Sequence, residues 1–120
     1  MTQEISKEDY ESVLGRVFVH KTSYRVCAYQ VVGRTKCYVR AAQVPTVAEY
    51  TQPGGEGTHR IDWSKIEQPK GNDKEAPLFR LENTAEENEE PRYCIYKTKD
   101  NIYAHAAKKD SDRAYSTVEY

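Results

Sequence analysis

The sequence predicts an α+β fold in which a mainly antiparallel sheet, built from two related β-hairpins, follows a short N-terminal helix. Three observations lead to this class. Apolar residues at helical spacing occur near the start of the chain, within residues 6–14. β-Prone runs separated by turn residues make up much of the remaining chain. Two of these runs, RVCAYQVVGRTKCYVRAA (25–42) and RYCIYKTKDNIYAHAA (92–107), resemble one another.

The helix is expected over residues 6–14. Ser6 is followed three residues later by an acidic side chain, which resembles a capping box, and Gly15 can end the helix. The apolar side chains at helical spacing are Tyr10, Val13 and Leu14.

The first hairpin is expected from the two β-prone runs at 24–32 and 35–44, after a brief run at 16–20. Gly33 and Arg34 lie between the two runs, and glycine can supply the positive φ of a tight turn. Residues 51–75 carry QPGGEG and QPKGND, a density of Pro and Gly that interrupts long elements. They are predicted to form an irregular connector that Trp63 and Ile66 hold against the core.

The rest of the chain is expected to contain a strand at 78–81 and then the second hairpin at 92–107. Between them, ENTAEENEE gathers acidic residues and is predicted to be a solvated loop or a frayed helical turn. The closing segment, AKKDSDRAYSTVEY, is charged and is expected to be mobile.

The two similar runs suggest an internal repeat. Arg25, Cys27 and Tyr29 align with Arg92, Cys94 and Tyr96, and, after a two-residue gap, Tyr38, Ala41 and Ala42 align with Tyr103, Ala106 and Ala107. An even gap keeps every later side chain on the same face of the strand. The prediction is a single domain, 1–120, with repeat unit one at about 16–50, the connector at 51–75, and unit two at about 76–120, related by a pseudo-two-fold axis. Chance similarity in a chain rich in Tyr and Ala is the alternative.

A two-residue turn in the first hairpin would place Tyr29 opposite Tyr38, and Cys27 opposite Arg40. The equivalent register of the second hairpin pairs Tyr96 with Tyr103 and Cys94 with His105, although a one-residue slip in KTKDN would invert it. The small aliphatic face is the expected core. Its members in the first hairpin are Tyr24, Val26, Ala28, Val32, Val39 and Ala41.

The opposite face of both hairpins is the candidate binding surface, because tyrosine offers a flat amphipathic contact and arginine adds bidentate or stacking recognition. The sequence predicts a small non-enzymatic protein-binding module that acts as an inhibitor, adaptor or assembly subunit, a class that includes phage- and virus-encoded inhibitors. Binding of single-stranded RNA or DNA by the same face is the alternative. In a third interpretation the tyrosine pairs only stabilise the hairpins. The candidate residues are Arg25, Tyr29, Lys36, Tyr38, Arg40, Arg92, Tyr96, Tyr103 and His105.

Catalytic chemistry has little support in the sequence. Cys94 opposite His105 has the residue types of a thiolate–imidazole pair, but nothing supplies an orienting group or an oxyanion donor. A metal site would need Cys27, Cys37, Cys94 and His105 to converge without any close ligand spacing. No catalytic residue, metal or cofactor is therefore predicted.

Composition limits the location and the partners. The net charge of −1 and the pI of about 6.3 give no overall attraction to nucleic acid or to an anionic membrane. A mean hydropathy of −0.91, with no signal-peptide pattern and no long apolar run, predicts a protein without membrane contact. The 3 cysteines show no CxxC spacing, which favours reduced thiols and a cytoplasmic location over a disulfide. A homodimer remains open.

Overall fold

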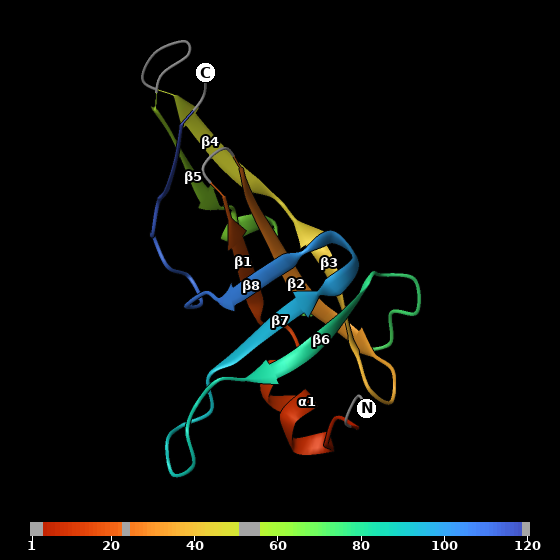
Figure 1. Ribbon diagram of the computed structural model, residues 1–120. Helices are drawn as coiled ribbons and strands as arrows, with labels where there is room; N and C mark the ends of the chain where they lie inside the picture. Colours follow the sequence, from red (N-terminus) through yellow and green to blue (C-terminus); the bar gives the residue numbers. More distant parts are fainter. Residues whose placement is uncertain (1–3, 23–24, 51–55, 119–120) are drawn as a thin grey trace.

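The chain folds into a closed antiparallel barrel of six strands, in the order β1-β2-β3-β6-β7-β8, with a separate three-stranded sheet, β4-β5-β9 (Figure 1). The computed structural model describes residues 4–22, 25–50 and 56–118. In this part of the chain no helix combines the length and the apolar character that crossing a bilayer requires. The predicted class, mostly antiparallel sheet with one short helix, is confirmed. The barrel strands are Val17–Lys21 (β1), Val26–Arg34 (β2), Val39–Val44 (β3), Leu78–Asn83 (β6), Tyr93–Lys97 (β7) and Ile102–Ala106 (β8); the sheet strands are Thr46–Tyr50 (β4), Glu56–Ile61 (β5) and Tyr115–Val118 (β9).

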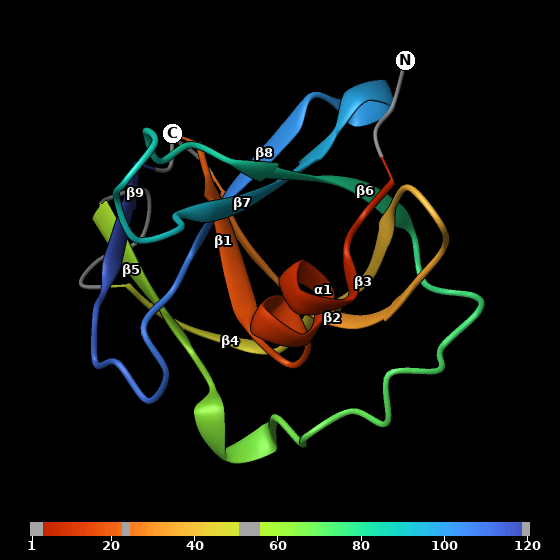
Figure 2. The same ribbon diagram turned by 90° about the horizontal axis from the view of Figure 1, so that it is seen from below.

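The helix α1, Lys7–Val13, lies across one end of the barrel (Figure 2). The side-chain oxygen of Ser6 accepts a hydrogen bond from the backbone N–H of Asp9 at 3.1 Å and so caps the helix. Gly15 follows the helix with a φ of 82°, a conformation that favours glycine. The predicted signals for the start and the end of the helix are therefore both confirmed. Val13 is completely buried and packs against the barrel core.

The barrel interior is filled by one face of each strand. Because strand side chains alternate, Phe18 on β1, Phe79 on β6 and Ile95 on β7 all point inward and are almost completely buried. The whole interior cluster is Ile5, Val13, Phe18, Val31, Val39, Ala41, Phe79, Tyr93, Ile95 and Ala104.

Strands β1 and β2 are also buried on their outer face. Val17 and Val19 point away from Phe18, yet both are less than a tenth exposed. They pack with Ile61 at the end of β5 and with Trp63 and Ile66 of the connector, which includes the 3-10 turn Trp63–Lys65 (η1). Burial on both faces explains the continuous apolar run VFV in β1. It also confirms that Trp63 and Ile66 hold the connector against the core.

Two predicted irregular segments contain strands. Residues 56–61 of the predicted connector form β5, which pairs with β4 on one side and with β9 on the other. The closing segment, expected to be mobile, supplies β9. Neither EGTHRI nor YSTV has a strong alternation of apolar and polar residues, so only the pairing partners reveal them as strands.

The predicted register of the first hairpin is wrong. Tyr29 pairs with Gln43 and not with Tyr38, a displacement of 43 − 38 = 5 residues. An odd displacement reverses the faces of one strand relative to the other. Val39 and Ala41 therefore face the interior, whereas Val26 and Ala28 are buried on the outer face. Val32 is half-buried, and Tyr24 lies outside the described residues.

The register differs from the predicted one because Gly33 lies inside β2, beside a bulge, and not in the turn. The backbone of Asp73 crosses here, so a Cβ built on Gly33 would overlap the Asp73 carbonyl oxygen. The glycine is needed for close packing, and residues 35–38 connect β2 to β3.

The second hairpin has the predicted register, with Cys94 opposite His105 and Tyr96 opposite Tyr103. It is joined by the 3-10 turn Thr98–Asp100 (η2) and by Asn101 in the left-handed region. The structure does not show the predicted repeat of the two hairpins. Tyr29 contacts the interior Phe79, with ring centroids 5.2 Å apart, whereas the aligned Tyr96 lies on the outer face.

The contact between Gly33 and Asp73 makes a specific prediction for stability. Gly33→Ala should lower the free energy of unfolding by about 1–3 kcal/mol, because the added methyl group overlaps a backbone atom that cannot move as a side chain can. Urea unfolding followed by far-UV circular dichroism measures the change. A variant as stable as the wild type would show that the approach of the two segments is looser than described.

Candidate binding surface

The outer face of β6, β7 and β8 carries a continuous group of polar and aromatic side chains, here called the outer aromatic face. Side chains alternate along each strand, so those next to the inward Phe79, Ile95 and Ala104 point outward. No other element crosses these three strands in Figures 1 and 2, in contrast to the covered outer face of β1 and β2. The face consists of Arg80, Glu82, Cys94, Tyr96, Tyr103 and His105.

Three rings follow one another across this face. The centroids of Tyr96 and Tyr103 are 5.6 Å apart, with their planes tilted by 53°. The His105 ring meets Tyr103 edge-on at 5.0 Å. Such offset and edge contacts are favourable for aromatic pairs and fix the rings in position. The face thus presents a preformed aromatic row.

Arg80 lies at one end of the row, with its guanidinium carbon 5.8 Å from the centre of the Tyr96 ring. It also forms an ion pair with Glu82 at 2.8 Å, and this hydrogen bond raises the pKa of Arg80. Tyr38, just before β3, lies near Arg80 and also raises its pKa. The charges of Arg80 and Glu82 therefore cancel one another beside the Tyr96 ring.

Cys94 and Tyr103 form the buried base of the face. The Cys94 sulfur and the Tyr103 hydroxyl oxygen are hydrogen-bonded at 2.8 Å, and Cys94 is 1% exposed. Burial raises the pKa of Cys94, which disfavours the thiolate that a nucleophile needs. The bond to Cys94, followed by burial, raises the pKa of Tyr103. These contacts support a structural role for the cysteine, although the backbone pairs it with His105 as predicted.

A hollow of about 480 Å³, here called the lateral hollow, continues the face past Tyr103 and His105 toward β1 and β9. Lys21 and Arg113 bring positive charge to it, and none of its lining residues in the described chain is Asp or Glu. The Nδ1 atom of His20 lies 3.0 Å from the carbonyl oxygen of Tyr103, which fixes the ring at the wall. The full lining is Val19, His20, Lys21, Tyr103, His105, Ala106, Arg113 and Tyr115.

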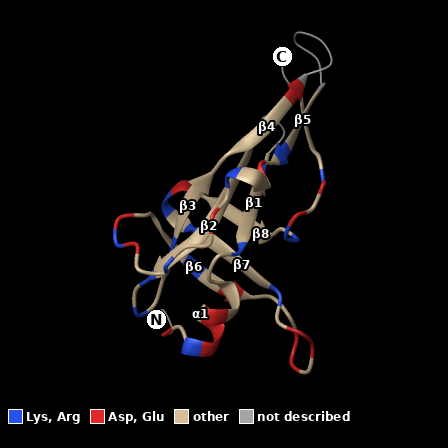
Figure 3. Cartoon of the chain, turned by 180° about the vertical axis from the view of Figure 1, so that it is seen from behind, with Lys and Arg blue, Asp and Glu red and all other residues tan. Residues whose placement is uncertain are grey.

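The nine residues predicted from the sequence do not form one surface. Tyr96, Tyr103 and His105 lie together, with Tyr38 near Arg80. Tyr29 points into the barrel, and Arg40 donates to the Ala76 carbonyl oxygen at 2.8 Å. The three other cations lie elsewhere: Arg25 precedes β2, Lys36 is in the β2–β3 connection, and Arg92 pairs with Glu89 in the acidic loop seen in Figure 3.

Sequence reasoning missed Arg80 and the cations of the lateral hollow. Arg80 had a usable signal, because it lies between two apolar residues in the strand LFRLEN and must point outward. Lys21 and Arg113 had none, since they are 92 positions apart (113 − 21) and only the fold brings them together.

The comparisons with known proteins add no assignment, because no protein-family model, curated protein or solved structure matches this chain. Among the described residues, no group of three or more His, Cys, Asp or Glu side chains is placed to hold a metal ion.

The raised pKa of Tyr103 predicts a contribution to alkaline stability. A phenol that ionises less readily in the folded state stabilises the protein fully below its unfolded pKa of about 10 and loses this contribution as the pH rises through the folded value. In Tyr103→Phe, the fall in unfolding free energy between about pH 9 and pH 11.5 should be shallower than in the wild type. Urea titrations at each pH provide the slopes, and equal slopes would contradict the assigned environment.

Proposed function

We propose that this protein is a non-enzymatic binding module that holds a protein partner on the outer aromatic face. The observation that carries the proposal is the uncovered row of Tyr96, Tyr103 and His105, with Arg80 over Tyr96. Aromatic residues and arginine are enriched at the energetic centres of protein interfaces, because they bury a large area at a low cost in side-chain entropy. Rings that already contact one another lose less freedom on binding.

The lateral hollow indicates which chemistry the partner presents. Lys21, Arg113 and the imidazole rings of His20 and His105 surround a space without carboxylates among the described residues. A partner Asp or Glu side chain would enter this space with favourable charge. The partner is therefore expected to place an acidic side chain beside an apolar segment that covers the rings.

Single-stranded nucleic acid is the second candidate, because bases stack on tyrosines while cations hold phosphates. The positive charge of Lys21 and Arg113 in the lateral hollow favours binding of a phosphate there. The Arg80–Glu82 ion pair disfavours it, since a carboxylate lies on the same face as the rings and would repel the phosphate backbone. The protein partner is accordingly the primary proposal.

The central test is affinity capture from nuclease-treated lysate, followed by measurement of the dissociation constant for the recovered partner. Tyr96→Ala removes a ring of the row, and Arg113→Glu reverses a charge of the hollow. Each variant should weaken the complex about tenfold or more, the effect typical of a central interface residue. Lys74→Glu reverses an exposed charge on the connector and is the matched control, with unchanged affinity expected.

A partner that binds both variants as tightly as the wild type would rule out this face as its site. Retention that disappears with nuclease, together with oligonucleotide binding that weakens steeply with salt, would instead select the nucleic-acid candidate.

A further inference from the structure

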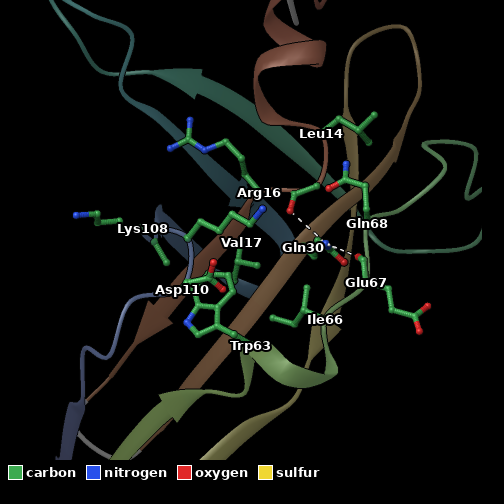
Figure 4. A pocket seen from close by; sticks show the side chains of 13 residues that line it. Leu14, Arg16, Val17, Gln30, Trp63, Ile66, Glu67, Gln68, Lys108 and Asp110 are labelled. Carbon is green, nitrogen blue, oxygen red and sulfur yellow. Dashed lines mark hydrogen bonds between the residues drawn. The ribbon is translucent and has the colours of Figure 1, made fainter.

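A second cavity, here called the seam cleft, lies on the outer side of the barrel between the α1–β1 turn, the connector and the segment that follows β8 (Figure 4). Its volume is about 520 Å³, within the range of small-molecule sites. Val17, Trp63 and Ile66 form its apolar side. None of its lining residues belongs to the outer aromatic face, so it is independent of the proposed protein site.

The walls of the seam cleft are fastened to one another. The side-chain amide nitrogen of Gln30 donates to the carbonyl oxygens of Gly15 at 3.1 Å and Glu67 at 3.0 Å, which joins the α1–β1 turn to the connector. Trp63 donates its indole N–H to the Ser111 carbonyl oxygen at 2.9 Å, which joins the connector to the segment after β8. The cavity is preformed and does not depend on a ligand to assemble it.

Gln30 leaves one hydrogen-bonding group for a ligand. Its two bonds to carbonyl oxygens identify the nitrogen, so the other side-chain atom is an acceptor oxygen. No hydrogen bond reaches that oxygen from the described residues, although Gln30 is only 7% exposed. No polar side-chain atom of the described chain is both fully buried and unbonded. The oxygen must therefore reach solvent, and Gln30 meets solvent in the seam cleft.

Positive charge lies at the mouth of the cleft, on the segment that follows β8. Lys108 and Lys109 are exposed, and neither has an ion-pair partner among the described residues, whereas the guanidinium carbon of Arg16 lies 5.9 Å from the centre of the inward Phe18 ring. The acidic lining residues are Glu67 and Asp110. Figure 4 places Glu67 on the side of the connector away from Arg16 and Lys108, whereas Asp110 lies beside Trp63. The mouth is thus net positive, with one opposing carboxylate close to the apolar wall.

We propose that the seam cleft binds a small amphipathic anion, namely an aromatic carboxylate that also carries a hydrogen-bond donor. The flat apolar part lies against Trp63 and Ile66. The donor reaches the amide oxygen of Gln30. The carboxylate meets the cations of the mouth, where Lys108 and Lys109 supply the attraction and Asp110 weakens it.

The test uses 6-hydroxy-2-naphthoate as the probe, because it combines a fused ring, a phenolic donor and a carboxylate. The chain has 1 tryptophan, so the indole N–H signal of Trp63 in a ¹H–¹⁵N spectrum reports on the cleft alone. This signal should shift and saturate with added probe. The neutral 6-hydroxy-2-naphthamide should bind about two- to fivefold more weakly, as expected for losing an exposed charge contact.

Two charge variants make opposite predictions. Lys108→Ala should weaken naphthoate binding about two- to fivefold, whereas Asp110→Asn should strengthen it by a similar factor. Asp110 has a φ of 58°, and asparagine tolerates that conformation, so the backbone is kept. Lys99→Ala, at the turn between β7 and β8, is the control and should leave the affinity unchanged.

Failure to observe a saturable Trp63 shift would overturn the proposal. Equal affinity for the naphthoate and the naphthamide, or an unchanged affinity in both Lys108→Ala and Asp110→Asn, would also overturn it. None of these three outcomes would affect the outer aromatic face, whose test uses different residues and a protein partner.

Discussion

The pairing of β1 with β8 is the contact on which the rest of the structure depends. Phe18 pairs with Ala106 and Val19 with His105, and the backbone N–H of Ala107 donates to the Val17 carbonyl oxygen at 2.8 Å. This seam closes the barrel and leaves no open edge in its sheet. Both cavities lie along it, because the outward Val17 lines the seam cleft and Val19 lines the lateral hollow.

The fold was predictable where a residue has one physical use. The helix was found because Ser6 caps and Gly15 terminates, and the second hairpin because its register gathers the apolar Ile95, Ile102 and Ala104 on one face. The predicted register of the first hairpin was wrong because Gly33 has two possible structural roles. Glycine allows a tight turn, but it also allows another backbone to approach, and the contact with Asp73 decides for the second. That contact lies 40 positions away (73 − 33), beyond the reach of local patterns.

The candidate binding surface was only partly predictable for a related reason. A correct register for β7 and β8 was enough to place Tyr96, Tyr103 and His105 together. Because the register of the first hairpin is displaced by an odd number of residues, Tyr29 faces the interior. Arg40 does not contribute to the binding surface, since its side chain donates a hydrogen bond to the Ala76 carbonyl oxygen. Closure of a barrel decides which face of each strand is inside, and no segment of sequence contains that information by itself.

The same closure sets the order in which the chain can fold. Strand β1 pairs with β8, which begins 81 positions after β1 ends (102 − 21). The barrel therefore cannot close until nearly all of its strands have been synthesised. During translation, β1 to β3 can form only an open sheet with an unpaired margin and exposed valines. Such a state is prone to association, and long-range pairing of this kind slows folding. The yield of native protein is therefore expected to depend on how long this open sheet persists before β8 becomes available.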